Sequence, residues 1–183
     1  MENNATSRTM CYAGIGNRQL LDAVDGDYGR PVADVMRFLA TALEKVGYTL
    51  FSGGAKGADE AFESGVSDSN HKMIFTAKDA TDETRTIARA NKLPGENLLG
   101  RKLDLYAREV SQIFGADQKT PVDFVLCYTR DGCESHETRS EETGGTGFAI
   151  ELASRNGIPV INLKNCGWEK RLKEILGEAE SYN

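Results

Sequence analysis

Short apolar runs alternate along the chain with longer segments in which apolar residues recur at three- and four-residue steps. The apolar runs are residues 10–16, 48–52, 72–77, 122–129 and 158–163. Each run is bounded by glycine or polar residues, which is typical of buried strands. Strands separated by helical segments predict a parallel sheet with helices on both faces. We therefore expect one doubly wound, Rossmann-like α/β domain of about five strands over residues 1–183.

The helical segments follow from the spacing of their apolar residues. The first stripe is Val32, Val35, Met36, Leu39, Leu43 and Val46, with Pro31 suited to the first turn and Gly47 to the C-terminal cap. The second stripe is Leu99, Leu103, Tyr106, Val110 and Ile113, and it follows a break at residues 93–97. Further helices are expected at residues 58–64, 146–156 and 168–180.

Composition narrows the function classes. The 183 residues are 39% hydrophobic and 27% charged, which is typical of an ordinary globular domain. The net charge of −6 disfavours broad contacts with nucleic acid or anionic membranes, because those need basic surfaces. No apolar run is long enough to span a bilayer, and the first ten residues lack an apolar signal core. We expect a cytoplasmic protein without membrane contact.

The cysteines and histidines show no metal-binding pattern. The four cysteines, Cys11, Cys127, Cys133 and Cys166, form no CxxC pair. Cys11 and Cys127 fall inside apolar runs and are expected to be reduced core thiols. Neither histidine has metal-ligand spacing with them. We therefore expect no metal site and no cofactor.

Three glycine-rich turns follow three of the predicted strands. They are AGIGNR (residues 13–18), SGGAKGAD (52–59) and TGGTG (143–147). Each could be an ordinary tight turn, but the carboxyl ends of parallel strands meet at one edge, where ligands bind. Turns that open helices also present N–H groups to anions. Because neither a P-loop nor a dinucleotide fingerprint is present, the sequence predicts a site for a nucleotide or phosphosugar without ATP hydrolysis.

The expected ligand-binding residues are the glycines of these turns with nearby cations, hydroxyls and one carboxylate. They are Gly14, Gly16, Arg18, Ser52, Gly53, Gly54, Lys56, Gly57, Asp59, Thr143, Gly144, Gly145, Thr146 and Gly147. Asp59 either faces a ribose or base or complements a helix start. Glu151, about one turn into the following helix, is either a surface residue or a partly buried carboxylate that binds ribose hydroxyls or assists cleavage of a glycosidic bond.

These motifs resemble those of the SLOG superfamily, which groups the DNA-processing protein DprA, YspA-like proteins and the LOG (lysine-decarboxylase-like) phosphoribohydrolases. LFSGGAKGADEAFESG is similar to the SGgArGiD element of DprA and YspA, with Lys56 where arginine is common. The segment from Asp123 to Leu163 is similar to stand-alone DprA-like proteins of phages and bacteria. The resemblance covers about Tyr12 to Leu163. It implies a Rossmann-like domain that binds nucleotide-derived ligands or nucleic acid at its glycine loops.

The resemblance also bears on activity. The phosphoribohydrolase branch has a PGGxGTxxE motif with a catalytic glutamate, and TGGTGFAIE places Glu151 at that position. Thr143 stands where the motif has proline, and Phe148 where it has threonine. DprA binds single-stranded DNA through a basic surface, whereas this chain is acidic.

Three functions follow as hypotheses. The first is binding or sensing of a nucleotide-derived small molecule, the second is hydrolysis of a nucleotide N-glycosidic bond, and the third is a DprA-like accessory role with single-stranded DNA. The charged loop at residues 129–142 is either solvated or a mobile lid. The apolar faces of residues 99–114 and 168–176 either cover the sheet, which we favour, or form a homo-oligomer.

Overall fold

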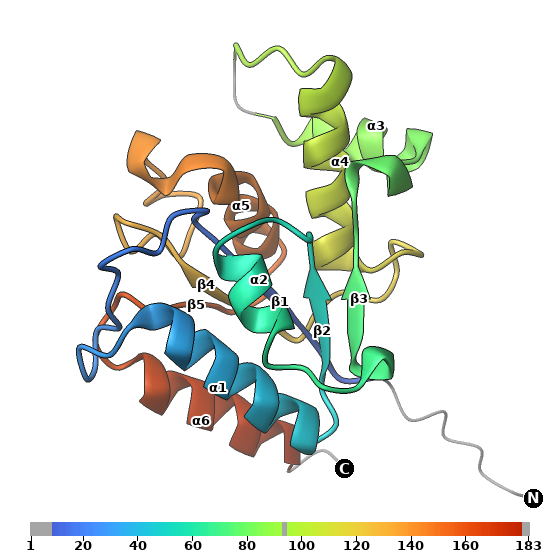
Figure 1. The fold of residues 1–183 in the computed structure, drawn as a ribbon. Coiled ribbons are helices and arrows are strands. Elements are labelled where there is room, and N and C mark those ends of the chain that lie inside the picture. The colour runs from blue at the N-terminus through green and yellow to red at the C-terminus, as the bar shows by residue number, and fades with distance from the viewer. Residues whose placement is uncertain (1–8, 93–94, 181–183) are drawn as a thin grey trace, which may run out of the picture.

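Strands and helices alternate along residues 9–92 and 95–180, which the computed structural model describes (Figure 1). The strands are β1 (Cys11–Gly16), β2 (Thr49–Ser52), β3 (Lys72–Ile74), β4 (Phe124–Tyr128) and β5 (Val160–Asn162). The α-helices are α1 (Val32–Lys45), α2 (Ala58–Glu63), α3 (Asp82–Ala90), α4 (Gly100–Phe114), α5 (Gly147–Arg155) and α6 (Trp168–Glu180). The described residues also contain three 3₁₀ helices, η1 (Ser69–His71), η2 (Ala77–Asp79) and η3 (Glu141–Thr146).

The strands form one parallel sheet in the order β3-β2-β1-β4-β5. In the central strand, Ala13 lies opposite Phe51 of β2 and Val125 of β4. The chain builds the sheet from β1 outward to β3, and then returns past β1 to add β4 and β5. The strand order therefore reverses beside β1, which is the position where open α/β sheets bind ligands. The expected fold class, a doubly wound, Rossmann-like α/β fold with a parallel sheet, is confirmed.

Helices cover both faces of the sheet. On one face, α1, α2 and α6 pack in an apolar cluster that includes Tyr12 of β1 and Leu126 of β4. On the other face, α3, α4 and α5 pack in a cluster that includes Ala13 and Val125. Successive strand residues point to opposite faces, so neighbours such as Tyr12 and Ala13 belong to different clusters. The sheet is therefore packed on both faces, and this packing holds the ends of its strands in place.

The stripe predicted for the first helix is buried except at its end. The buried residues are Val32, Val35, Met36, Leu39 and Leu43. Because α1 ends at Lys45, Val46 lies beyond the helix and is 56% exposed. Gly47 follows with φ of +91°, a conformation that glycine adopts without strain and that ends the helix.

The apolar faces of α4 and α6 cover the sheet. Val110 and Ile113 pack in one cluster, and Trp168 and Leu172 pack in the other. Leu99, expected on the stripe of α4, instead precedes the helix and is 64% exposed. A break separates α3 from α4 as expected, although two of its predicted residues, 93–94, lie outside the described part of the chain. In the described residues, no helix combines the length and apolar character needed to cross a bilayer.

The charged loop at residues 129–142 is tied to its surroundings. Glu134 accepts hydrogen bonds from the Arg171 side chain of α6 and from the N–H of Asn162. His136 Nδ1 lies 3.0 Å from Ser154 Oγ on α5. These contacts anchor the loop beside β4 to α5, β5 and α6, and the mobile lid considered from the sequence stays a hypothesis.

Candidate functional site

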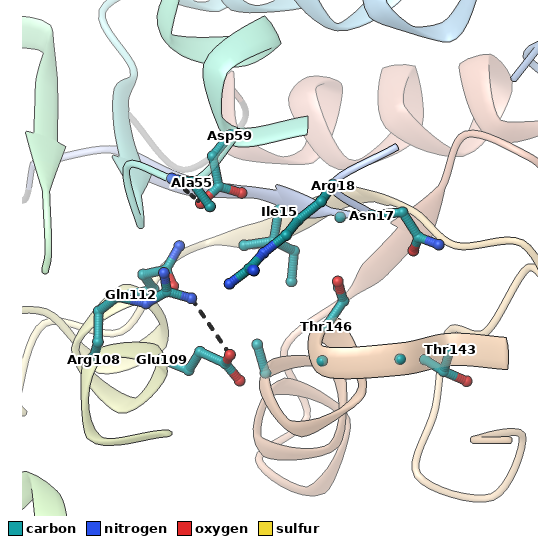
Figure 2. Close-up of a pocket in the computed structure, with 14 residues that line it drawn as sticks. Ile15, Asn17, Arg18, Ala55, Asp59, Arg108, Glu109, Gln112, Thr143 and Thr146 are labelled. Atoms are coloured by element: carbon teal, nitrogen blue, oxygen red, sulfur yellow. Dashed lines mark hydrogen bonds and ion pairs between the residues drawn. The ribbon is translucent and has the colours of Figure 1, made fainter. Parts of the chain in front are cut away.

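A pocket of about 360 Å³ opens at the carboxyl ends of β1, β2 and β4, with one face of α4 as its opposite wall (Figure 2). Small-molecule sites usually measure about 300–1,000 Å³, so the pocket is large enough for a small ligand. Among the residues predicted from the sequence, those that line it are Gly16, Arg18, Asp59, Thr143, Gly144, Gly145 and Thr146. The first and third glycine turns therefore meet at one site, as predicted.

Arg18 reaches the pocket from the loop that follows β1. Gly57 lets this loop lie close to α2, because a Cβ at Gly57 would stand 2.4 Å from the carbonyl oxygen of Arg18. The N–H of Ala58 donates to the Asn17 carbonyl at 3.2 Å, and the N–H of Asn17 donates to the Tyr128 carbonyl at 3.1 Å. The backbone is thus fixed, while the Arg18 side chain is exposed and points into the pocket (Figure 2).

Three N–H groups of the SGGAKGAD turn, those of Gly53, Gly54 and Ala55, are paired within the turn. Asp59 Oδ2 accepts hydrogen bonds from the N–H groups of Gly53 at 3.1 Å and Ala55 at 3.3 Å. The N–H of Gly54 donates to Ser52 Oγ at 3.4 Å. The turn is closed by its own side chains, and of these residues only Asp59 and Ala55 line the pocket. Gly53 and Gly54 have their N–H groups paired and do not line the pocket, so the direct anion contact predicted for them has no support in this geometry.

Other predicted residues near this turn also stay outside the pocket lining. A Cβ on Gly14 would lie 2.7 Å from the Phe62 ring, so Gly14 allows α2 to pack on β1. Ser52 is buried and donates its hydroxyl to Glu63. Lys56 is exposed and is not part of the lining. Gly14, Ser52 and Gly57 thus serve packing and turn formation in place of the ligand contacts predicted for them, and Lys56 makes no contact with the pocket.

The TGGTG turn contributes open backbone. Gly144 has φ of +66°, which residues with a side chain rarely adopt. A Cβ added at Gly145 would meet no atom within 4 Å, so protein packing does not explain the missing side chain. Thr143 is held by the turn itself: its hydroxyl donates to Asp131, and its N–H donates to the Ser140 carbonyl at 3.3 Å. Thr146 directs its side chain toward the pocket in Figure 2.

Glu151 does not line the pocket. Its side chain is 5% exposed, and its two oxygens pair with Arg139 Nη1 and Arg155 Nε, both at 2.9 Å. Gly147 makes room for Arg139, because a Cβ at Gly147 would lie 2.5 Å from Arg139 Nε. Glu151 and Gly147 therefore stand outside the pocket lining, and the contacts that the structure gives them are structural. This ion pair ties the 129–142 loop to α5.

Three pocket residues on α4 were not anticipated from the sequence. Arg108, Glu109 and Gln112 face the strand ends, although polar residues beside an apolar stripe are usually solvated. One signal was present: Glu109 and Gln112 directly precede Val110 and Ile113 of the buried stripe, so they stand at its border. The sequence does not show that this border faces a cavity.

Arg108 is held beside two carboxyl groups. Its Nη1 donates to the Gly53 carbonyl at 3.1 Å, and its Nη2 lies 3.4 Å from Glu109 Oε1. A Cβ on Gly53 would stand 2.7 Å from the guanidinium, so glycine permits this approach. The Arg108 side chain is 12% exposed. It is therefore a positioned cation in the wall of the pocket.

The two carboxyl groups of the pocket differ in protonation. Burial raises the pKa of Glu109 to about 8 and the pKa of Asp59 to about 6. The charge of Arg108 opposes both increases, and the charge of Asp59 adds to the increase at Glu109. At pH 7 Glu109 is mainly protonated and Asp59 mainly ionised. With Arg18 and Arg108 both charged, the pocket favours an anion.

Glu109→Gln is expected to flatten the pH dependence of stability. The pKa of Glu109 rises from 4.5 to about 8 on folding, so its contribution to stability is present below pH 4.5 and is lost as the pH rises through about 8. Melting temperatures of both proteins between pH 5 and 9 test this. The wild type should lose stability relative to Glu109→Gln up to about pH 8, whereas a constant difference would contradict the protonated state.

Buried polar atoms without a hydrogen-bond partner concentrate at this pocket. Of seven such side-chain atoms in the described residues, five belong to pocket-lining residues. They are Asn17 Oδ1, Arg108 Nε, Glu109 Oε2 and the amide oxygen and nitrogen of Gln112. Buried polar groups are normally paired, and each unpaired group costs about 1–3 kcal/mol. A cluster of them is expected where a ligand completes the hydrogen bonds.

The fold and the pocket define a Rossmann-like α/β protein with a polar cavity where the strand order reverses. In comparisons with known proteins, no protein-family model, curated protein or solved structure matches the chain. Membership of the SLOG superfamily stays a prediction from the motifs. Within residues 9–92 and 95–180, no group of three or more His, Cys, Asp or Glu side chains is arranged to hold a metal ion.

Proposed function

We propose that this protein binds a small phosphorylated molecule derived from a nucleotide, in the pocket at the carboxyl ends of β1, β2 and β4. One observation carries the proposal: Arg18 and Arg108 line a single cavity together with Gly144 and Gly145, two glycines with open space where a side chain would stand. Arginine and backbone N–H groups at a helix start are the groups that proteins commonly use for phosphate. The pocket combines two arginines with the glycine turn that leads into α5.

The two ends of the pocket suit different parts of such a ligand. Arg18 and the turn before α5 favour the phosphate, because the positive end of the helix dipole adds to the arginine charge. Ile15 and Ala149 add apolar surface between the polar walls. A nucleotide has both a charged group and a flat, largely apolar ring. The motif resemblance to the SLOG superfamily supports the same class of ligand.

A small molecule is favoured over nucleic acid. The net charge of −6 opposes the many phosphate contacts that a DNA strand requires. A pocket of about 360 Å³ also holds one small ligand, whereas a strand needs an extended groove. The DprA-like role is therefore the weakest of the three functions.

Hydrolysis of an N-glycosidic bond is a second candidate, which the pair of buried carboxyl groups favours. Protonated Glu109 is suited to protonate a leaving base, and ionised Asp59 is suited to accept a proton from the attacking water. In this candidate function, Glu109 has the role that the sequence suggested for Glu151, which is to assist departure of the base. Measurement of free base from nucleoside monophosphates, with Glu109→Gln as the control, distinguishes hydrolysis from binding.

Gly145→Val tests the binding proposal. The added side chain meets no protein atom at its Cβ, so folding should be retained while the side chain occupies space in the pocket. We expect affinity for a nucleoside monophosphate, measured by calorimetry, to fall by about tenfold or more, since a lost phosphate contact costs about 1.5 kcal/mol or more.

Gly177→Val is the matched control for this test. Gly177 also has open space around an added Cβ, but it lies on α6, away from the pocket. The control should bind like the wild type. If a panel of nucleoside mono-, di- and cyclic monophosphates shows no binding to the wild type, the proposal is overturned; equal affinity of wild type and Gly145→Val would move the ligand to another surface.

A further inference from the structure

One turn of α4 presents uncharged hydrogen-bonding groups to the pocket. Gln112 is 1% exposed and lines the pocket, and neither its amide oxygen nor its amide nitrogen has a hydrogen-bond partner. Glu109, three residues earlier on the same face, has an oxygen without a hydrogen-bond partner. Residues three apart on a helix are neighbours. Donor and acceptor atoms are therefore grouped on one wall.

This wall differs from the rest of the pocket in charge. Arg18 and the backbone of Gly144 and Gly145 form the other side of the cavity. Around Glu109, the facing charged groups are Arg108 of its own helix, Asp59 of α2 and Arg139 of the 129–142 loop. Burial favours the protonated form of Glu109 at neutral pH. The Gln112 amide itself is uncharged and offers a neutral polar group both a donor and an acceptor, and the Arg108 guanidinium stands at the edge of this wall beside Glu109.

We propose that Glu109 and Gln112 recognise a heterocyclic base through the donor and acceptor atoms on one edge of its ring. This inference rests on the proposed phosphate site, and it assigns the opposite wall of the same pocket to the base of the ligand. A glutamine amide matches such an edge, because its oxygen accepts from an amino group while its nitrogen donates to a ring nitrogen. Ile15 and Ala149 supply apolar contact beside the ring.

Unpaired buried groups give this recognition its selectivity. A ligand without a base leaves the Gln112 amide unpaired, whereas a base completes both of its hydrogen bonds. Sites built to hydrogen-bond a ligand group discriminate strongly against ligands that lack it. We therefore expect the wild type to bind AMP at least tenfold more tightly than ribose 5-phosphate, which carries the same phosphate and sugar.

The test compares the AMP-to-ribose-5-phosphate affinity ratio in three proteins by calorimetry. The ratio should fall at least tenfold in Gln112→Met, because methionine has a similar shape but no amide. It should not change in Gln118→Met, since Gln118 also has a buried oxygen without a partner but lies outside the pocket. Melting curves show that each variant is folded.

The pH dependence of the same ratio tests Glu109. In the wild type the ratio should fall between pH 7 and 9.5 as Glu109 loses its proton, and in Glu109→Gln it should stay constant. The phosphate ionises alike in both ligands, so its titration cancels in the ratio.

The outcomes separate the two proposals. If both ligands bind the wild type equally, or Gln112→Met keeps the full preference, base recognition at this wall is overturned while phosphate binding stands. A wild-type ratio that does not change with pH overturns the part assigned to Glu109. If neither ligand binds and the wider nucleotide panel also fails, the proposed function fails and this inference fails with it.

Discussion

Glu151→Ala is expected to lower the free energy of unfolding by about 3–5 kcal/mol, which is the usual cost of leaving one partner of a buried ion pair uncompensated. Arg139 would keep its charge at a position where its side chain is only 12% exposed. The same change would free the 129–142 loop from α5, since Arg139 makes that connection. For a chain of this length the melting temperature should fall by roughly 6–20 °C, as measured by calorimetry or circular dichroism.

Glu60→Ala is the control for this loss of stability. Glu60 is an exposed glutamate at the start of α2, so its replacement should change stability by about 0.5 kcal/mol or less. A Glu151→Ala protein that melts like the wild type and yet fails to bind or convert the ligand would contradict the structural role. That result would restore the catalytic role considered for Glu151.

Arg108→Met is expected to weaken nucleotide binding by roughly 10- to 150-fold. A hydrogen bond to a charged group contributes about 1.5–3 kcal/mol, and Arg108 is already positioned by its bond to the Gly53 carbonyl. We assign the Arg108 charge to the phosphate, from the border between the two walls, so the loss should be similar for AMP and ribose 5-phosphate. This pattern differs from that of Gln112→Met, which changes the ratio between them.

Arg101→Ala is the control for this loss of affinity. Arg101 lies in the first turn of α4 and is exposed. Its replacement by alanine therefore removes one positive charge, as Arg108→Met does, but outside the pocket. Its affinity should match that of the wild type within about twofold. If Arg108→Met and Arg101→Ala weaken binding equally, general electrostatic attraction explains the effect, and Arg108 does not contact the ligand.

The fold could be predicted from the sequence because each element has a local signal. The apolar runs of β1, β2 and β4 are short and bounded by glycine or polar residues, and the stripe from Val32 to Leu43 has clear helical spacing. The errors fall at element ends. Val46 and Leu99 fit their apolar stripes, but α1 ends just before Val46 and α4 begins just after Leu99. Spacing alone does not show where a helix ends.

The site could be predicted only in part, because glycine has several structural uses. Gly144 and Gly145 line the pocket, whereas Gly14 and Gly57 allow close packing and Gly53 accommodates Arg108. The sequence shows the same residue in each case. The contributions of α4 were missed for a related reason: helix periodicity indicates which face is buried, but not that the border of this face reaches the strand ends.

The ties within the pocket walls have a kinetic consequence. Asp59 closes the turn after β2, and Glu134 anchors the 129–142 loop before η3, so the recess has its shape before anything enters it. Little chain entropy is then spent on association. The rate of ligand association would then be set by diffusion and by the electrostatic attraction between Arg18 and an approaching anion. A pocket with walls held in this way is expected to bind a narrow set of ligands, because its walls do not readily change conformation to fit a ligand of another shape.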